Sequence, residues 1–170
     1  DFDLSNHEKF SSKKLKYFDS KNNESYIPYV LETSIGVDRM FLAVFSNSLF
    51  EEKLEDGSVR TVLKLPTILA PIKIAILPLL KKDGLPEIAK NLHEKLKIEY
   101  TVSYDEKDAI GRRYRRQDAL GTPFCVTVDH KSKEDNTFTL RERDSMIQER
   151  LSFKELLKRM ESTVSIKSWI

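Results

Sequence analysis

The sequence predicts an α/β protein with a mixed five-stranded sheet flanked by helices. First, residues 72–77 (IKIAIL) form a nearly continuous apolar run, as expected for a strand buried on both faces. Second, strand-like and helix-like segments alternate after this run, which is typical of parallel strands joined by crossover helices. Third, two strand-like segments, residues 136–143 and 146–152, follow each other closely, which indicates two more strands or a hairpin.

The first part of the chain is less regular. Residues 1–25 are polar and lysine-rich without a clean period, so we expect loops or short irregular elements there. Residues 26–34 (YIPYVLETS) alternate between two faces, which predicts a strand whose end or edge is marked by Pro28. From Gly36 onward apolar residues recur at helical spacing, which predicts a buried helix.

A charged segment, residues 51–61 (EEKLEDGSVRT), follows this helix and contains a glycine. We interpret it as a connection and place the domain boundary there, which gives two domains, residues 1–62 and 63–170. Ser152 and Glu155 form a capping-box pattern that predicts a closing helix. Between the domain boundary and the closing helix, the sequence predicts helices over residues 85–98 and 106–120, and strands over residues 98–104 and 123–130.

The composition excludes some classes of function. The 29 basic and 27 acidic side chains leave a net charge of +2, so any basic surface that attracts nucleic acid must be local. A single cysteine, Cys125, excludes an internal disulfide and a cysteine-rich metal site, which fits a reducing compartment. The sequence has no signal peptide and no apolar run of about 18 residues, so we expect a soluble, intracellular protein without a membrane partner. Because the chain starts at Asp1 rather than Met, we expect a piece of a longer protein.

The first candidate site lies where the predicted strand passes into the predicted helix. On the strand, Glu32 and Ser34 share a face about 7 Å apart, and a carboxylate beside a hydroxyl suits a small ammonium group. Gly36 permits a tight turn and close approach of a ligand to the backbone. Arg39 falls in the first turn of the helix, where the helix dipole already favours an anion such as phosphate. The alternative is a surface salt bridge between Glu32 and Arg39.

The second candidate is the segment GRRYRRQDALG, residues 111–121, which carries four arginines within five positions. A helical wheel places these arginines opposite the apolar side of the helix or on its flank, as a local positive patch suited to phosphates or bases. Asp108 precedes Arg112 by four residues and is placed to pair with it. The alternative is an ordinary solvated basic face.

A third polar cluster, Arg141, Arg143 and Asp144, lies at a predicted strand end, where alternating charges are also ordinary for an exposed strand. The three histidines are scattered without metal-ligand spacing, and Cys125 is expected to pack inside a strand. The sequence therefore supports neither nucleophilic catalysis nor a metal site.

Several segments resemble one enzyme family. Residues 26–45 (YIPYVLETSIGVDRMFLAVF) resemble the third signature of class II aminoacyl-tRNA synthetases, and residues 1–11 (DFDLSNHEKFS) resemble a stretch of the same catalytic domain. LAPIKIAILPL, DAIGRRYRRQDALGTPFCVTVD and TLRERDSMIQERLS resemble the anticodon-binding domain shared by the glycyl, prolyl, threonyl and histidyl enzymes. Together the segments make the chain similar to the C-terminal part of a glycyl-tRNA synthetase.

This resemblance implies a strand–helix remnant of the antiparallel class II catalytic domain over residues 1–62 and an anticodon-binding domain over residues 63–170. It implies a parent that is a glycine–tRNA ligase and attaches glycine to its tRNA using ATP, with Mg²⁺. Glu32 and Ser34 would hold the ammonium group of glycine. Gly36 and Arg39 would belong to the ATP site.

The resemblance also implies tRNA as the partner rather than DNA, a homodimeric parent and a cytoplasmic location. The anticodon-binding domain would read the two cytosines common to glycine anticodons, as single-stranded RNA is usually read. The candidate RNA contacts are Arg112, Arg113, Arg115, Arg116, Arg141 and Arg143. The first two class II signatures lie upstream of Asp1 in such proteins, so we expect that this chain alone neither activates glycine nor binds a cofactor tightly.

Alternatives remain open at this point. An accessory RNA-binding or dimerisation module of the same fold, without ligase activity, would share these motifs. Another amino-acid specificity on the same architecture is also compatible with the sequence. A plain nucleotide-binding α/β domain is disfavoured, because no glycine-rich phosphate loop follows a strand.

Overall fold

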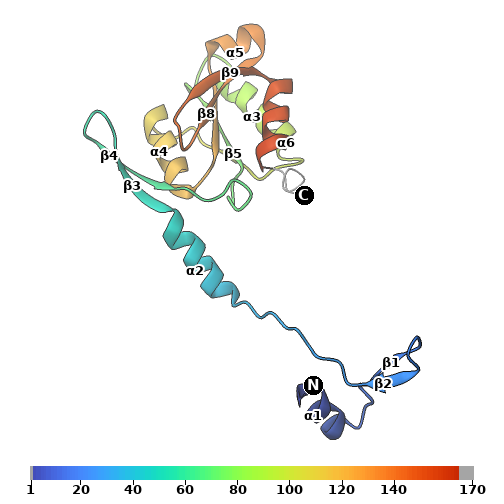
Figure 1. The fold of residues 1–170 in the computed structure, drawn as a ribbon. Coiled ribbons are helices and arrows are strands. Elements are labelled where there is room, and N and C mark those ends of the chain that lie inside the picture. The colour runs from blue at the N-terminus through green and yellow to red at the C-terminus, as the bar shows by residue number, and fades with distance from the viewer. Residues whose placement is uncertain (1, 165–170) are drawn as a thin grey trace. The chain divides into compact units, whose positions relative to one another are not determined.

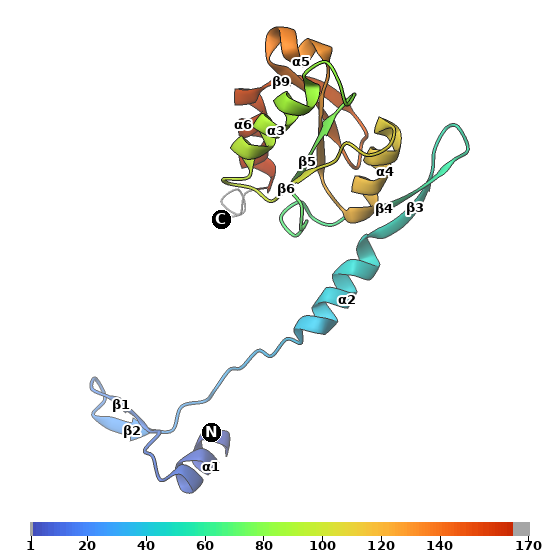
Figure 2. The same cartoon turned by 180° about the vertical axis from the view of Figure 1, so that it is seen from behind.

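The computed structural model describes residues 2–164 (Figures 1 and 2). The chain divides into two compact units, one that ends at Arg39 and one that begins at Met40. This division precedes the boundary expected near residue 62, because residues 49–63 form a hairpin that contacts helix α4 (Ile110–Leu120) of the second unit. The assignment of residues 1–62 to a catalytic domain stays a prediction.

The first unit contains a helix, α1 (Phe2–Ser11), and an antiparallel ribbon of β1 (Tyr17–Asp19) and β2 (Glu24–Tyr26). Helix α1 has no buried residue, so its sequence shows no apolar period and the helix was not predicted. The strand expected over residues 26–34 is wrong, because residues 27–36 lie in neither helix nor strand. Pro28 has no N–H to donate, and within residues 2–164 no strand pairs with this segment.

Helix α2 (Val37–Ser48) begins where the sequence predicts, directly after Gly36. The expectation that it is buried is wrong, because Ser48 is its only buried residue and Phe41 is 67% exposed. The rings of Phe41 and Phe45 stack on each other with their centroids 5.8 Å apart. The apolar pattern therefore predicts the helix correctly but not the exposure of its apolar side chains in the described chain.

Residues 51–61, expected as a connection, lie within an antiparallel hairpin of β3 (Leu49–Lys53) and β4 (Val59–Leu63). Strand β4 buries Arg60 and Val62, which alternate onto one face, whereas β3 is largely exposed. Gly57 supplies the φ of 78° that the turn requires. The charges of β3 concealed the strand in the sequence.

The second unit is built on one five-stranded sheet with the order β6-β5-β7-β8-β9 (Figure 1). β5, β6 and β7 are parallel, and β8 and β9 continue the sheet in antiparallel pairs. This arrangement confirms the predicted mixed sheet. Its strands are β5 (Ile74–Pro78), β6 (Val102–Tyr104), β7 (Phe124–Val128), β8 (Thr137–Glu142) and β9 (Gln148–Ser152).

Helices cover both faces of this sheet (Figures 1 and 2). α3 (Leu85–Leu96), α4 and α6 (Phe153–Val164) confirm the three predicted helices of this region. Ser152 and Glu155 form the expected capping box, since each accepts a hydrogen bond from the backbone N–H of the other. A short helix, α5 (His130–Asp135), was not predicted, although Asp129 caps it.

Strand β5 is buried along its whole length, as its apolar sequence predicts. Ile74 and Ile76 pack with residues of α3 and α6 in the main core, whereas Ala75 and Leu77 face the opposite side, where Tyr114 of α4 packs. Helix α4 therefore packs on the face of the sheet opposite to that covered by α3 and α6. Within the described part of the chain, every helix is too short or too polar to span a bilayer.

Candidate nucleic-acid interface

Helix α4 is fixed at its C-terminal end by a close approach to β4. Gly121 caps the helix in the left-handed conformation, with a φ of 80°. A Cβ atom at this position would lie 3.1 Å from the backbone oxygen of Leu63. The glycine thus lets the hairpin lie against α4, and this contact places the arginine segment beside the hairpin.

Two of the four arginines on α4, Arg112 and Arg115, are exposed as the helical wheel predicts. Arg115 donates from a terminal nitrogen to the hydroxyl of Ser58, near the tip of the hairpin, at 2.9 Å. Arg115 also helps to hold the pKa of the Asp56 carboxyl below its ordinary value, after the larger effect of hydrogen bonds from Ser58. The hairpin tip and the exposed side of α4 thus form one continuous polar surface.

Arg116 is less free than the sequence suggests. Its guanidinium contacts Asp105 at 2.8 Å and Asp108 at 3.3 Å, and these hydrogen bonds, that to Asp105 first, raise its pKa. The expected pair between Asp108 and Arg112 is wrong. Asp108 precedes the helix with a φ of 71°, and its carboxylate contacts Arg116 instead.

Arg113 is 3% exposed, so the described structure buries it rather than presenting it at the surface of the helix, and its contact with RNA stays a prediction. Its guanidinium donates to the carbonyl oxygens of Pro78 at 2.6 Å, Leu79 at 3.2 Å and Asp105 at 3.2 Å. Burial lowers its pKa, although the nearby Asp105 opposes the shift. Arg113 therefore binds the backbone oxygen of the last residue of β5 and those of the residues directly after β5 and β6, at the carboxyl ends of these parallel strands.

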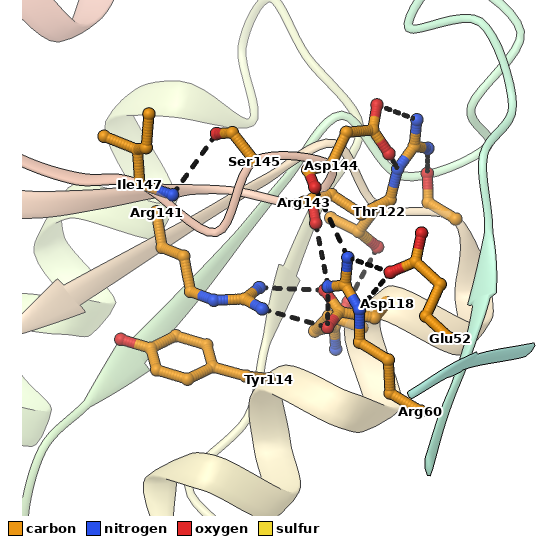
Figure 3. Close-up of polar contacts among 12 residues, drawn as sticks. Glu52, Arg60, Tyr114, Asp118, Thr122, Arg141, Arg143, Asp144, Ser145 and Ile147 are labelled. Carbon is orange, nitrogen blue, oxygen red and sulfur yellow. Dashed lines mark hydrogen bonds and ion pairs between the residues drawn. The ribbon is translucent and has the colours of Figure 1, made fainter. Parts of the chain in front are cut away.

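Arg141 and Arg143 are also buried in the described structure, at 6% and 3% exposure, and their contact with RNA stays a prediction. Arg141 forms a two-pronged ion pair with Asp118, at 2.8 and 3.0 Å, and its guanidinium lies 4.8 Å from the ring centre of Tyr114 (Figure 3). Burial lowers the pKa of Arg141, but the pair with Asp118 outweighs it and the net shift is upward.

Arg143 holds together two chain segments that lie beside the end of α4. It donates to the carbonyl oxygens of Gly121 and Leu65, each at 2.9 Å, and to the carboxylate of Asp144. Burial alone would raise the pKa of Asp144, but the hydrogen bond from Arg143 outweighs it and the pKa is lowered. This arginine is structural in the described chain.

Arg60 is the residue that sequence reasoning missed. It is 2% exposed and donates to Glu52, to Asp118 at 3.1 Å and to the backbone oxygen of Arg143 at 2.9 Å (Figure 3). Its alternation with Val62 along β4 is a signal for burial, which the charged residues of the same segment conceal in the sequence.

The glycine and ATP candidates are not brought into a site by this structure. Glu32 and Ser34 lie exposed in the irregular segment before α2, so the geometry that a strand would impose on them is absent. Gly36 and Arg39 are also exposed, and Arg39 folds back so that its Cδ would lie 3.7 Å from a Cβ at position 36. No group of three or more potential metal ligands occurs within residues 2–164.

The arrangement of sheet and helices has a known counterpart. A family model described as the anticodon binding domain matches residues 73–163, just over half of the chain. The chain belongs to the anticodon-binding domain family. The matched residues run from the start of β5 into the last turn of α6, so this anticodon-binding domain comprises the five-stranded sheet and the helices on both of its faces.

The anticodon-binding domain and the residues before it are similar to curated glycine–tRNA ligases. One from Treponema denticola is 49% identical over 168 residues, which cover 96% of this chain and 37% of that protein. Another from Mycoplasmopsis synoviae is 52% identical over 159 residues, which cover 92% of this chain and 35% of that protein. The chain therefore spans little more than a third of the length of these relatives.

Solved structures show the same fold. The RNA binding domain of threonyl-tRNA synthetase from Cryptosporidium parvum matches 59% of this chain and 26% of that chain with a TM-score of 0.54 and 26% identity. Prolyl-tRNA synthetase from the same organism matches 66% of this chain and 30% of that chain with a TM-score of 0.54 and 18% identity. The second likeness concerns the fold alone.

Proposed function

We propose that the chain is the anticodon-binding part of a glycine–tRNA ligase. The whole enzyme joins glycine to its tRNA using ATP, by way of glycyl-adenylate and an ester with the terminal ribose. The observation that carries this proposal is an identity of 49–52% to curated glycine–tRNA ligases over more than nine-tenths of the chain. The family match over residues 73–163 supports a role in RNA recognition.

The RNA surface of this proposal is narrower than the sequence suggested. Arg112 and Arg115 are the exposed arginines of α4, and guanidinium groups bind phosphate oxygens with two parallel hydrogen bonds or stack on bases. Arg116 borders them but is paired with two aspartates. Arg112 and Arg115 would therefore hold the RNA backbone while neighbouring groups read the splayed cytosines of the glycine anticodon.

Fluorescence anisotropy with two anticodon stem-loops at one stated salt concentration tests this function. One stem-loop carries the glycine anticodon, and the other has its two shared cytosines replaced. We expect the chain to prefer the first by about tenfold, or roughly 1.4 kcal/mol. Equal binding of the two, or no binding of either, would overturn anticodon reading by this chain.

Two variants locate the surface. Arg112→Ala and Arg115→Ala should each weaken binding of both stem-loops and reduce the salt dependence by about one phosphate contact. The matched control is Lys158→Ala, which removes an exposed cation from α6 on the other face of the sheet. It should leave both affinities unchanged, and an equal loss in the control would indicate only non-specific charge.

The glycine and ATP roles of the first unit belong to the whole enzyme in this proposal. The carboxylate of Glu32 and the hydroxyl of Ser34 suit the ammonium group of glycine, and the guanidinium of Arg39 beside Gly36 suits a triphosphate accompanied by Mg²⁺. These four residues are exposed in the described chain, so the remaining part of the enzyme would have to complete the site. The homodimer and the cytoplasmic location are proposed on the same family basis.

A further inference from the structure

Three separate segments of the chain meet at the carboxylate of Asp118 (Figure 3). Asp118 lies near the end of α4 and is 1% exposed. It accepts hydrogen bonds from Arg60 of strand β4 at 3.1 Å and from Arg141 of strand β8 at 2.8 and 3.0 Å. One carboxylate therefore joins the hairpin, the helix and the sheet.

The β3–β4 hairpin contributes two charged residues, Arg60 and Glu52, to this cluster. The guanidinium of Arg60 is shared between Asp118, the backbone oxygen of Arg143 and the carboxylate of Glu52, at 2.6 Å in the last case. Glu52 also pairs with Lys64, and the hydrogen bond from Lys64 is the first cause of its lowered pKa. The hairpin is thus fixed to the domain by buried, charge-assisted hydrogen bonds.

Such a cluster is a poor choice for stability alone. Burying charged groups carries a desolvation penalty, and replacing a buried ionic network by apolar side chains of similar volume is often neutral or stabilising. What the charged cluster does provide is one defined position for the hairpin, since the forked donors of Arg60 and Arg141 fit the carboxylate of Asp118 in a single geometry. This fixed position brings Ser58 within 2.9 Å of Arg115 at the exposed side of α4.

We propose that Asp118 is a positioning residue for base recognition, and that the hairpin tip and the exposed side of α4 bind single-stranded RNA as one surface. By holding Arg60 and Arg141 together, Asp118 sets the position of the hairpin tip, where bases would be read, relative to Arg115, which would hold the RNA backbone. Recognition of a base by several groups requires their positions to be fixed within about half an ångström, whereas phosphate contacts tolerate more freedom. This inference rests on the proposed anticodon-reading function and adds the part of the chain that sets its specificity.

Two variants cut the link from different sides. Asp118→Asn removes the charge that pairs with both arginines. Arg60→Gln removes the guanidinium by which the hairpin binds Asp118 and leaves the Asp118–Arg141 pair in place. If Asp118→Asn does not fold, Arg60→Gln alone provides the test. In both variants we expect hydrogen exchange of the β3–β4 amides to accelerate at least tenfold relative to those of β5. The preference for the glycine anticodon should fall from about tenfold to less than threefold, with weak binding of both stem-loops retained.

The matched control is Asp129→Asn, which also breaks an aspartate–arginine pair, that with Arg150 at 2.6 Å, and does not touch the hairpin. It should lower the thermal midpoint while the preference between stem-loops stays at its original value. If the control loses the preference equally, the effect is general destabilisation and the inference is overturned.

The remaining outcomes distinguish failure of the positioning role from failure of the proposed function. A hairpin that loosens while the preference persists, or a hairpin whose exchange is unchanged in Asp118→Asn and Arg60→Gln, would overturn the positioning role alone. An original chain without any preference between the stem-loops would overturn the proposed function, and this inference with it.

Discussion

Cys125 is the second residue of β7 and is buried at 1% exposure, and burial raises the pKa of its thiol to about 12. At pH 8 only about one thiol in ten thousand would be ionised, and the thiolate is the reactive form. We therefore expect Cys125 to remain unmodified by a thiol reagent in the native chain and to react promptly in concentrated urea. Rapid reaction without denaturant would contradict the buried position.

Asp129 provides a test of pH dependence. Burial by itself raises its pKa, but the hydrogen bond from Arg150 and that from the backbone of Ser132 outweigh this effect, so the pKa lies below its ordinary value of 3.8. A lowered carboxyl pKa stabilises the fold fully above the ordinary value, and this stabilisation is lost as the pH falls through the lower, folded-state value.

Asp129→Asn should therefore lower the free energy of unfolding by about 1 kcal/mol at pH 7, because it removes the carboxylate charge that pairs with Arg150. The difference from the original chain should shrink as the pH is lowered from 6 to about 2. Urea denaturation at several pH values measures this, and a difference that grows toward acid would contradict the assignment.

At the scale of the element, α4 offers two glycines in contrasting environments. Gly121 has a φ of 80°, and a Cβ there would lie 3.1 Å from the oxygen of Leu63. Gly121→Ala should lower the free energy of unfolding by about 2 kcal/mol, because it adds left-handed strain and pushes β4 from the helix.

Gly111, in the first turn of the same helix, has no atom within 4 Å of a Cβ. Gly111→Ala should be neutral or stabilising by up to about 1 kcal/mol, since alanine favours the helix. Thermal or urea unfolding of both variants measures the pair. A similar loss in both would show that the contact of Gly121 with β4 is not what matters.

Apart from the exposed helix α2, the elements that the sequence predicted most clearly are those whose apolar residues meet the core. The alternation of core and solvent positions in α3 and α6, and the continuous apolar run of β5, report burial directly, whereas the buried residues of α4 are the polar Arg113, Gln117 and Asp118. The predictions for residues 26–34 and 51–61 were wrong, because whether such a segment forms a strand depends on a neighbouring strand with which it can pair. The first alternates without a partner strand in the described chain, and the second forms a hairpin despite its charge.

The sequence also predicted incompletely which arginines are exposed, for a related reason. A run of arginines reveals a charge pattern but not which carbonyl or carboxylate each side chain meets. Arg113 turns to the carbonyls that end β5, and Arg141 turns to Asp118, contacts that depend on the three-dimensional crossing of α4 over the sheet. Arg112 and Arg115, which point away from that crossing, are where the wheel predicted them.

At the scale of the whole molecule, the two units differ in how well they are packed. The second unit contains a continuous core on both faces of its sheet, whereas helix α1 of the first buries nothing. Helix α2 carries exposed apolar side chains, among them Phe41 and Leu42 at 67% and 63% exposure. Apolar groups of this size on one helix are characteristic of a surface that another part of a protein covers.

This contrast leads to a prediction about activity. Adenylate formation requires the amino acid, ATP and the stabilising charges to be held together in a fixed geometry, because positioning and preorganised electrostatics supply most of the catalysis. Glu32, Ser34 and Arg39 are exposed in or beside an irregular segment, where solvent screens their charges and nothing fixes their spacing. The 170-residue chain alone should therefore show no glycine-dependent ATP–pyrophosphate exchange.

The same preparation must bind the glycine anticodon stem-loop, which shows that its second unit is folded while exchange is absent. Arg39→Ala should leave this RNA binding unchanged, because the proposed RNA surface consists of α4 and the β3–β4 hairpin of the second unit. Exchange that is detected in the original chain and abolished in Arg39→Ala would contradict the prediction. It would mean that residues 1–62 complete a glycine and ATP site without the rest of a ligase, against the exposure of every candidate residue in the described structure.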